Sequence, residues 1–459
     1  MRPHSDLVPS GPVTWLARAI ALTFYRVDVV GAPPASGPLL LLPNHPNALL
    51  DPALVIATAG RPVRFLAKST LFRGPLAPLI RASGAIPVYR KQDAADVQRN
   101  AESFAAVDSA LSRGEAVCVF PEGISHSSGM LEPLRTGAAR MALSAAATGV
   151  DVQLVAVGIN LEQKVAFRSR VTIAYGQPMA VAAAGLGATD KQAVHALTAE
   201  ITERMRSLLI EAEPTQDTAL VERLHRLLQL ERPASGQEEA LDRRRLIAEG
   251  LQRLRTERPE WYEQALVQLR RYDDRMARFG MADAALDWTL SRREAWRFAR
   301  RELPLAIVLV PLAATALLIF AVPYFLTAVA AKLSKDMDVT ATMKVLGGIA
   351  IHGAWVGMLA TAIGATLGSA WGIASLAVLP GVAVAGLIAL ERETSAWQTA
   401  RSWVAARSAH ATTTKALKRR RAELAEVLER IYEQLFAETA TSSVSSAGTS
   451  QRRGSTSGN

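Results

Sequence analysis

Two long stretches without a charged side chain constrain the fold of this chain most. Residues 303–331 and 345–390 contain no Asp, Glu, Lys or Arg. A membrane-spanning helix needs about 20 apolar residues. The first stretch is therefore long enough for one crossing and the second for two, with a turn near Gly364 to Gly372. We expect a transmembrane region of two or three helices over residues 301–392.

The sequences on either side of these stretches carry arginine and tryptophan side chains, which are typical of membrane interfaces. They are Arg292, Arg293, Arg297, Arg300, Arg301, Trp288 and Trp296 before, and Trp397, Arg401 and Trp403 after. Pro304, Pro311 and Pro323 make the first stretch the weakest candidate, and a re-entrant or surface-lying helix is the alternative there. A basic helix at Lys415 to Arg421 favours an even number of crossings, because positive charge prefers the cytoplasmic side. The number of crossings stays open.

Residues 38–213 alternate short apolar runs with helical patterns. The candidate strands are Leu39 to Leu42, Val63 to Ala67, Ile86 to Tyr89, Ala116 to Phe120, Leu154 to Val157 and Val171 to Tyr175. The candidate helices are Pro52 to Thr58, a segment within residues 70–79, Ala94 to Arg113, Arg135 to Ala147 and Lys191 to Glu213. Strands separated by helices indicate an α/β domain.

The remaining segments differ in composition. We assign residues 1–37 to an amphipathic membrane-surface segment with a helix at 13–30, for which a simple core helix is the alternative. Residues 214–300 are assigned to a charged helical module, 393–437 to a basic C-terminal helix and 438–459 to a disordered tail. The N-terminal apolar pattern is interrupted by Arg18 and Arg26, unlike a signal peptide, which predicts catalysis on the cytoplasmic side. The single cysteine, Cys118, excludes an intrachain disulfide and a cysteine-based zinc site.

The candidate chemistry begins in "LLLLPNHPNALLDP", where we expect a strand to end at Leu42 and a helix to begin at Pro52, capped by Asp51. The loop between them can fold His45 back onto Asp51. A carboxylate bonded to one ring nitrogen fixes the tautomer and raises the basicity of the other nitrogen, which can then take a proton from a hydroxyl. The alternative is that His45 satisfies loop carbonyls while Asp51 only caps its helix.

Further downstream, several residues would suit a phosphate group. Glu122 and Gly123 follow one apolar strand, at the end of the strand where α/β proteins bind ligands. Arg90 follows another strand, and Arg135 opens a helix whose free amides attract anions. Each feature alone is more typical of a solvated charge or a turn, but together they predict a phosphate pocket beside a histidine base. No G-x-S-x-G elbow or nucleotide-binding glycine motif occurs, and the histidines are too scattered for a metal site.

The blocks "NHPNALLDP", "GAIPVYR", "FPEGISH" with "LRTGAARMAL", and "LVAVGINLE" resemble, in order and spacing, the four blocks of the glycerolipid acyltransferase (PlsC-type) family. The chain is most similar to the branch that acylates glycerol 3-phosphate or dihydroxyacetone phosphate. The resemblance runs from about Pro38 to Met179. It implies a mixed sheet flanked by helices, no cofactor, and acyl-CoA or acyl-carrier protein as co-substrate.

The resemblance also implies roles for residues. His45, supported by Asp51, would deprotonate the acceptor hydroxyl for direct attack on an acyl thioester, without a covalent enzyme intermediate. The positions matched to the binding or shaping of the acceptor phosphate pocket are Arg90, Glu122 and Gly123, with Lys68 and Arg135 as further anion contacts.

We therefore expect a membrane-bound acyltransferase that acylates glycerol 3-phosphate or 1-acylglycerol 3-phosphate on the cytoplasmic face of the cell membrane. The net charge of +10 suits an anionic membrane surface. A nucleic-acid partner is disfavoured, because the basic clusters adjoin the apolar stretches and lack aromatic platforms. The alternatives are an acyltransferase that remodels other lysophospholipids and a lipid-binding membrane protein without turnover.

Overall fold

The computed structural model describes residues 11–48, 50–73, 77–89, 100–126, 128–181, 189–213, 217–288, 291–332 and 337–430. The chain divides into two compact units. One, which we call the sheet unit, comprises Met1–Leu220, Gly236–Arg245 and Ala330–Leu346; the other, the helical unit, comprises Val221–Ser235, Leu246–Val329 and Gly347–Asn459.

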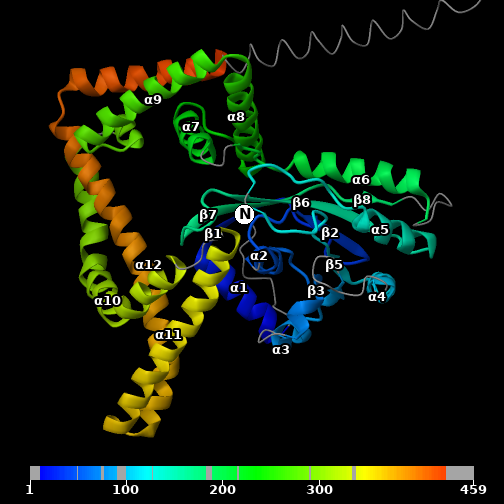
Figure 1. The fold of residues 1–459 in the computed structure, drawn as a ribbon. Coiled ribbons are helices and arrows are strands. Elements are labelled where there is room, and N and C mark those ends of the chain that lie inside the picture. Colours follow the sequence, from blue (N-terminus) through cyan, green and yellow to red (C-terminus); the bar gives the residue numbers. More distant parts are fainter. Residues whose placement is uncertain are drawn as a thin grey trace, which may run out of the picture. The chain divides into compact units, whose positions relative to one another are not determined.

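The sheet unit is built around one mixed sheet (Figure 1). Its strands in the described part of the chain are β1 (Tyr25–Val30), β2 (Leu39–Pro43), β3 (Val63–Lys68), β4 (Ile86–Val88), β5 (Ala116–Cys118), β6 (Gln153–Leu161), β7 (Ser169–Tyr175) and β8 (Met179–Ala180). The spatial order is β1-β7-β6-β2-β5-β3-β4, with β8 beside β6. The pairs β6–β7 and β6–β8 are antiparallel and the others are parallel. The expected α/β fold with a mixed sheet is confirmed.

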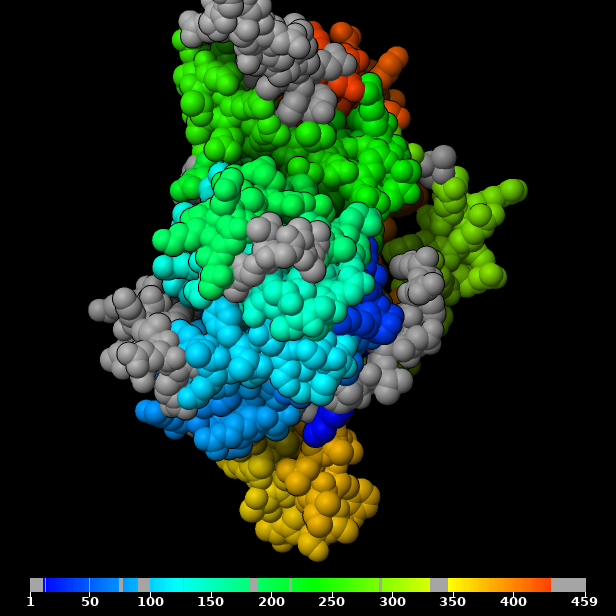
Figure 2. All heavy atoms as spheres, turned by 90° about the vertical axis from the view of Figure 1, so that its right-hand side faces the viewer, coloured from blue at the N-terminus to red at the C-terminus, as the bar shows by residue number. Residues whose placement is uncertain are grey.

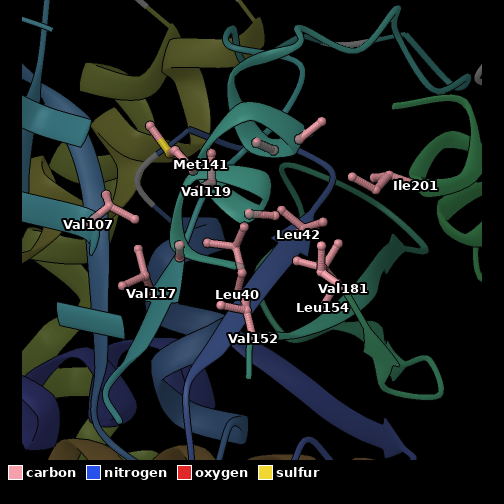
Figure 3. Close-up of a cluster of buried hydrophobic side chains, with 14 of the residues drawn as sticks. Leu40, Leu42, Val107, Val117, Val119, Met141, Val152, Leu154, Val181 and Ile201 are labelled. Carbon is pink, nitrogen blue, oxygen red and sulfur yellow. The ribbon is translucent and has the colours of Figure 1, made fainter. Parts of the chain in front are cut away.

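Helices cover both faces of this sheet. They are α1 (Pro12–Phe24), α2 (Leu50–Thr58), the short 3₁₀ helix η2 (Ser69–Phe72), α3 (Ala77–Ala82), α4 (Asn100–Ser112), α5 (Gly137–Ala147) and α6 (Lys191–Arg206). In β2, Leu40 and Leu42 pack with α4, α5 and α6 (Figure 3), whereas Leu39 and Leu41 pack with α1 and α2. A strand buried on both faces is apolar throughout, which explains the unbroken run of leucines.

The largest correction to the sequence prediction concerns the N-terminal segment. We predicted a helix over 13–30, but α1 ends at Phe24 and residues 25–30 form β1, which pairs in parallel with β7. The partner strand lies more than 100 residues away in the sequence, so local periodicity carries no sign of this pairing. Trp15, Leu16 and Leu22 of α1 are exposed, while Ala21 is buried in the core.

Several predicted boundaries also shift. The strand with the four leucines continues to Pro43, and α2 begins at Leu50 instead of Pro52. Helix α5 begins at Gly137, so Arg135 precedes it, and α6 ends at Arg206 instead of residue 213. Residues 94–99, the predicted start of the helix before Arg113, lie outside the described residues. Cys118 is buried in β5.

The rest of the described chain is helical. The elements are α7 (Asp217–Glu231), α8 (Gln237–Glu257), α9 (Pro259–Phe279), η5 (Asp283–Asp287), α10 (Arg292–Lys332), α11 (Met337–Leu367), α12 (Ser369–Ser408) and a helix over 411–430. In α10, α11 and α12, the segments Arg292–Ala330, Leu346–Leu367 and Ser369–Ser408 are long and apolar enough to cross a membrane.

The predicted turn within the second apolar stretch is confirmed, because α11 and α12 are separated only by Gly368. Gly368 has a positive φ of 104°, a conformation that glycine adopts without strain. Figure 2 shows the side chains at this end of α11 and α12, in yellow to orange, packed against one another. The three prolines of the first stretch lie inside α10, which continues through them.

Candidate active site

The predicted site residues gather at one edge of the sheet because four neighbouring strands run in parallel. Strands β2, β5, β3 and β4 all point the same way, so their carboxyl ends lie along the same edge. His45 follows β2, Glu122 follows β5, and Lys68 is the last residue of β3. This edge is where ligands bind in open α/β sheets.

His45 and Asp51 are hydrogen bonded as predicted. Nδ1 of His45 lies 2.8 Å from Oδ2 of Asp51. The same oxygen accepts the backbone N–H of Asn47 at 2.6 Å. The fold of the loop differs in one respect, because α2 begins at Leu50 and Asp51 lies in its first turn instead of at the N-cap position. Asp51 is completely buried, whereas 18% of the His45 side chain is exposed.

The imidazole of His45 is held from two sides. Its ring stacks on Phe120 with 4.0 Å between the ring centroids and 20° between the planes. Because an ionised Asp51 can only accept a hydrogen bond, the network assigns the proton of the neutral ring to Nδ1 and the lone pair to Nε2. Nε2 is therefore the nitrogen that can take a proton from a substrate.

The environment of Asp51 is apolar enough to affect its titration. Burial raises the pKa of Asp51, and the hydrogen bonds from His45 and from the Asn47 amide act in the opposite direction. Its second oxygen, Oδ1, is buried and has no hydrogen-bond partner in the part of the chain that the structure describes. Every polar contact seen for this carboxylate therefore converges on Oδ2 and keeps that oxygen directed at His45.

Glu122 is also buried, with 1% of the residue exposed, and its carboxylate holds the backbone of the base. Oε1 accepts the backbone N–H of His45 at 2.8 Å. Oε2 is hydrogen bonded to Nε2 of His126 and accepts the backbone N–H of Glu132 at 3.2 Å. Burial alone would lower the pKa of His126, but the hydrogen bond and the charge of Glu122 raise it overall.

Gly123 and Arg135 lie together beside Glu122. Gly123 has a φ of 71°, and a Cβ added there would lie 3.3 Å from Cγ of Arg135. The backbone N–H of Arg135 donates to the carbonyl of Pro121 at 2.7 Å. Arg90, the remaining predicted residue, lies outside the described residues.

Four residues that the sequence analysis gave no role complete the site. The side chain of Asn44 bonds to both backbone groups of Ile159, with N···O distances of 3.1 and 2.7 Å, and so attaches the loop to β6. The hydroxyl of Tyr25 donates to the carbonyl of Lys164 at 2.5 Å and accepts from Nδ2 of Asn47 at 2.6 Å.

The fourth of these residues is Lys164, whose Nζ donates to the carbonyl of His126 at 3.2 Å. Asn44 and Asn47 were visible as polar residues next to His45 in the sequence. Tyr25 and Lys164 carry no such signal, because Tyr25 is placed by the pairing of β1 with β7 and Lys164 by the loop between β6 and β7.

The arrangement provides a proton acceptor, His45, supported by the buried carboxylate of Asp51, and Lys164 is bonded to the neighbouring His126 carbonyl. Over the described residues, no group of three or more His, Cys, Asp or Glu side chains is placed to hold a metal ion. The chemistry that these residues support by themselves is removal of a proton from a hydroxyl by Nε2 of His45.

Comparisons with known proteins show similarity to acyltransferases over part of the chain. The acyltransferase family model matches residues 26–160. Two proteins of Saccharomyces cerevisiae are similar: glycerol-3-phosphate O-acyltransferase 2 is 38% identical over 84 residues, which is 18% of this chain and 11% of that protein. Glycerol-3-phosphate O-acyltransferase 1 is 30% identical over 124 residues, which is 26% of this chain and 16% of that protein. The chain thus matches less than a fifth of the length of either yeast protein.

Among solved structures, the crystal structure of the 1-acyl-sn-glycerophosphate (LPA) acyltransferase PlsC from Thermotoga maritima is similar at 18% sequence identity and a TM-score of 0.31. The match covers 42% of this chain and 76% of that one.

Proposed function

Because this chain belongs to the PlsC-type glycerolipid acyltransferase family, we propose that it transfers a fatty acyl group from an acyl thioester to glycerol 3-phosphate or 1-acylglycerol 3-phosphate. The observation that carries the proposal is the 2.8 Å contact between His45 and Asp51 at the edge of the sheet. Both residues lie within the segment that matches the acyltransferase family model.

In the proposed reaction, Nε2 of His45 takes the proton from the acceptor hydroxyl as the hydroxyl oxygen attacks the thioester carbonyl carbon. The carbon–sulfur bond then breaks, and the leaving thiolate takes the proton back from the imidazolium. Asp51 stabilises the positive charge that develops on His45 and keeps the ring oriented. One ester bond replaces one thioester bond, and the enzyme is unchanged.

The acceptor carries a phosphate, for which we propose Arg90, Lys68 and Arg135 as contacts. Arginine and lysine suit a phosphate through charge-assisted hydrogen bonds. Gly123 lies close to Arg135 and leaves room beside it. Glu122 is buried and bonded to the backbone of His45, so we assign it to shaping the pocket. We do not assign Glu122 to direct phosphate binding, because its negative charge would repel the phosphate.

The acyl chain and the product are lipids, which suits the apolar helices of this protein. We propose that the catalytic unit lies on the cytoplasmic face of the cell membrane and takes its acyl group from acyl-CoA or an acyl-carrier protein. The exposed Trp15, Leu16 and Leu22 of α1 offer an apolar surface to the membrane interface. Basic side chains add about 1 kcal/mol each of attraction to anionic headgroups.

The decisive experiment is acyl transfer by the purified full-length protein in lipid nanodiscs. Release of free thiol from acyl-CoA would be followed with glycerol 3-phosphate, 1-acylglycerol 3-phosphate and lysophosphatidylcholine as acceptors. We expect turnover with a phosphorylated glycerol and its loss in His45→Ala. Equal rates for the two proteins would refute the proposal and favour a lipid-binding protein. Turnover with lysophosphatidylcholine alone would favour a remodelling enzyme.

The assignment of Arg90 can be tested in the same assay. We expect Arg90→Ala to raise the KM for the phosphorylated acceptor by about tenfold or more, the value of one charge-assisted hydrogen bond, with little change in the KM for acyl-CoA. The matched control is Arg204→Ala, which removes an exposed arginine from α6. An unchanged acceptor KM in Arg90→Ala would show that Arg90 does not bind the phosphate.

A further inference from the structure

The carboxylate of Glu122 lies between two histidines and joins them. On one side it accepts the backbone N–H of His45, and on the other it is bonded to the ring of His126. The backbone N–H of His126 donates in turn to the carbonyl of His45 at 3.2 Å. Both backbone polar groups of the base are therefore held by the segment from Glu122 to His126.

The ring of His126 is not placed to exchange protons with a substrate. Its Nε2 is bonded to Glu122, and its Nδ1 is buried without a hydrogen-bond partner among the described residues. The side chain is 12% exposed. An imidazole with one nitrogen occupied and the other enclosed can hold a neighbouring group but is poorly suited to act as a base.

Resting on the function proposed above, we propose that His126 is a positioning residue for acyl transfer, which holds Glu122 so that Glu122 holds the backbone of His45. Without the His126 ring, the backbone N–H of Glu132 is the one donor to Oε2 of Glu122 that remains among the described residues. The buried carboxylate can then rotate, and the N–H of His45 loses its fixed acceptor. A small displacement of the base lowers the rate of proton transfer without removing the substrate sites.

The test compares His126→Ala, His126→Gln and wild type in the nanodisc assay. We expect His126→Ala to lower kcat about tenfold or more with both KM values unchanged. His126→Gln keeps an N–H donor near the position of Nε2 and should restore most of the rate. His195→Ala, an exposed histidine on α6, is the matched control.

The possible results separate this inference from the proposed function. An inactive wild-type protein would refute the proposed function itself. An active wild type with an unchanged kcat in His126→Ala would refute only the role of His126, as would a Gln variant that is as slow as the Ala variant.

A second inference rests on the helical unit alone. Arg421, in the helix over 411–430, is 1% exposed. Its guanidinium binds Glu231 through Nε and Asp287 through Nη2, each at 2.5 Å, and donates to the carbonyl of Asp283 at 2.8 Å. The segment after α12 is thus joined through a buried guanidinium to residues that precede α10.

Other contacts extend this junction. Nζ of Lys418 lies 2.7 Å from Asp287, and Arg420 donates to Gln268 of α9 at 3.1 Å. At the end of α12, the hydroxyl of Ser402 accepts the backbone N–H of Ala282 at 3.2 Å. A polar body of this kind cannot extend across the hydrocarbon core of a bilayer. The chain must therefore leave this polar body before α10 and return to it after α12 on the same side of the membrane.

We infer that only two of the three apolar helices cross the membrane fully, and that these are α11 and α12. They form a hairpin at Gly368, in which Gly364 and Gly372 pack closely: a Cβ added at Gly372 would lie 2.9 Å from Cα of Gly364. Such a close approach of glycine backbones is typical of paired membrane helices.

Helix α10 packs first along α12 and then back along α11. Near its start, Glu302 binds Arg392 of α12 at 2.8 Å, and Ala316 lies against Gly386. Phe320 then meets Val356 and Leu379 in a cluster where all three helices touch.

Beyond that cluster the partners of α10 move away from the hairpin turn. The carbonyl of Ile319 accepts from the indole of Trp355 at 3.0 Å, whereas Thr327 lies beside Gly348. Pro323 lies between these two contacts, where a proline can bend a helix. Helix α10 therefore enters the bilayer beside α12 and returns toward the same side beside α11.

Labelling of single cysteines tests this topology. In a Cys118→Ser background, an impermeant maleimide would be applied to right-side-out and inverted membrane vesicles containing Ser235→Cys, Lys332→Cys, Ser369→Cys or Thr412→Cys. We expect positions 235, 332 and 412 to react from one side and position 369 from the other. Reaction of 235 and 412 from opposite sides would refute the even number of crossings. Reaction of 332 from the same side as 369 would refute the re-entrant path of α10.

Discussion

The two units of this protein each bury a cluster of charged side chains, and the two clusters are completed differently. In the helical unit, Oδ1 of Asp283 accepts from the hydroxyl of Tyr272 at 2.7 Å, and Oδ2 binds Arg223 at 2.6 Å. Burial alone would raise the pKa of Asp283, but the hydrogen bonds from Arg223 and Tyr272 lower it overall. Each oxygen of this carboxylate has a donor.

In the sheet unit, the cluster around His45 is left incomplete. Oδ1 of Asp51, Oδ1 of Asn47 and Nδ1 of His126 are buried without a hydrogen-bond partner in the described part of the chain. Burial leaves the pKa of Asp51 raised. Unsatisfied buried polar atoms destabilise a protein, so they persist where the arrangement serves another purpose. Charge pairing in the helical unit stabilises the fold, whereas charge in the sheet unit orients one imidazole.

The sharpest test of this difference is Asp51→Asn. An amide can donate to Nδ1 of His45 and so favours the tautomer in which Nε2 carries the proton. We expect kcat for acyl transfer to fall about a thousandfold or more, with a modest change in the apparent melting temperature. Retention of activity would show that Asp51 serves only the fold.

The opposite pattern is expected for Arg421→Ala in the helical unit. Removal of this buried cation takes the bonded guanidinium from Glu231 and leaves Asp287 with Lys418, which should lower the free energy of unfolding of this unit by about 3 kcal/mol, the lower end for a buried pair, because both carboxylates are partly exposed. Chemical denaturation followed by tryptophan fluorescence would measure the loss. Arg419→Ala, which removes an exposed arginine paired with Glu423, is the adjacent control and should leave the stability nearly unchanged. Equal stability of the two variants would contradict the structural role of Arg421.

A smaller effect is expected where the incomplete cluster is attached to β1. Tyr25→Phe removes the hydroxyl that bridges Asn47 and Lys164. We expect a loss of about 1–2 kcal/mol in stability and a severalfold lower kcat, because Asn47 also donates to Asp51. Measurement of both quantities in one preparation distinguishes this variant from Arg421→Ala, for which we expect kcat of the folded fraction to be unchanged.

The smallest expected effect is a pH dependence of stability from His126. Its pKa is raised above the ordinary value of about 6.5, because Glu122 and Glu132 outweigh burial and the charge of Lys164. A raised folded-state pKa gives stability that is fully present below the unfolded value and is lost as the pH rises through the folded value. The melting temperature of wild type relative to His126→Gln should therefore fall as the pH rises from the unfolded value through the raised folded-state pKa of His126. A constant difference would contradict the ion pair.

Much of the sheet unit was predictable because its signals are local. The buried run before His45 predicted a strand, and the short loop to Asp51 predicted their contact. The N-terminal segment shows the limit of this reasoning. Residues 25–30 are part of an apolar pattern that suits a helix, and only pairing with β7 makes them a strand. The capping role predicted for Asp51 was wrong. Pro52 indicated a helix that begins at residue 52, but α2 begins at Leu50, so Asp51 lies inside its first turn.

The sequence by itself determined the class of the fold, the apolar helices and the pairing of His45 with Asp51, because periodicity, length without charge and short spacing act along the chain. Only the tertiary structure decided that Glu122 accepts the backbone N–H of His45, that Tyr25 and Lys164 contact the loop and segment around His45, and that Arg421 joins segments on either side of the apolar helices. These contacts join residues far apart in the sequence, and their energy depends on burial, which no local pattern encodes.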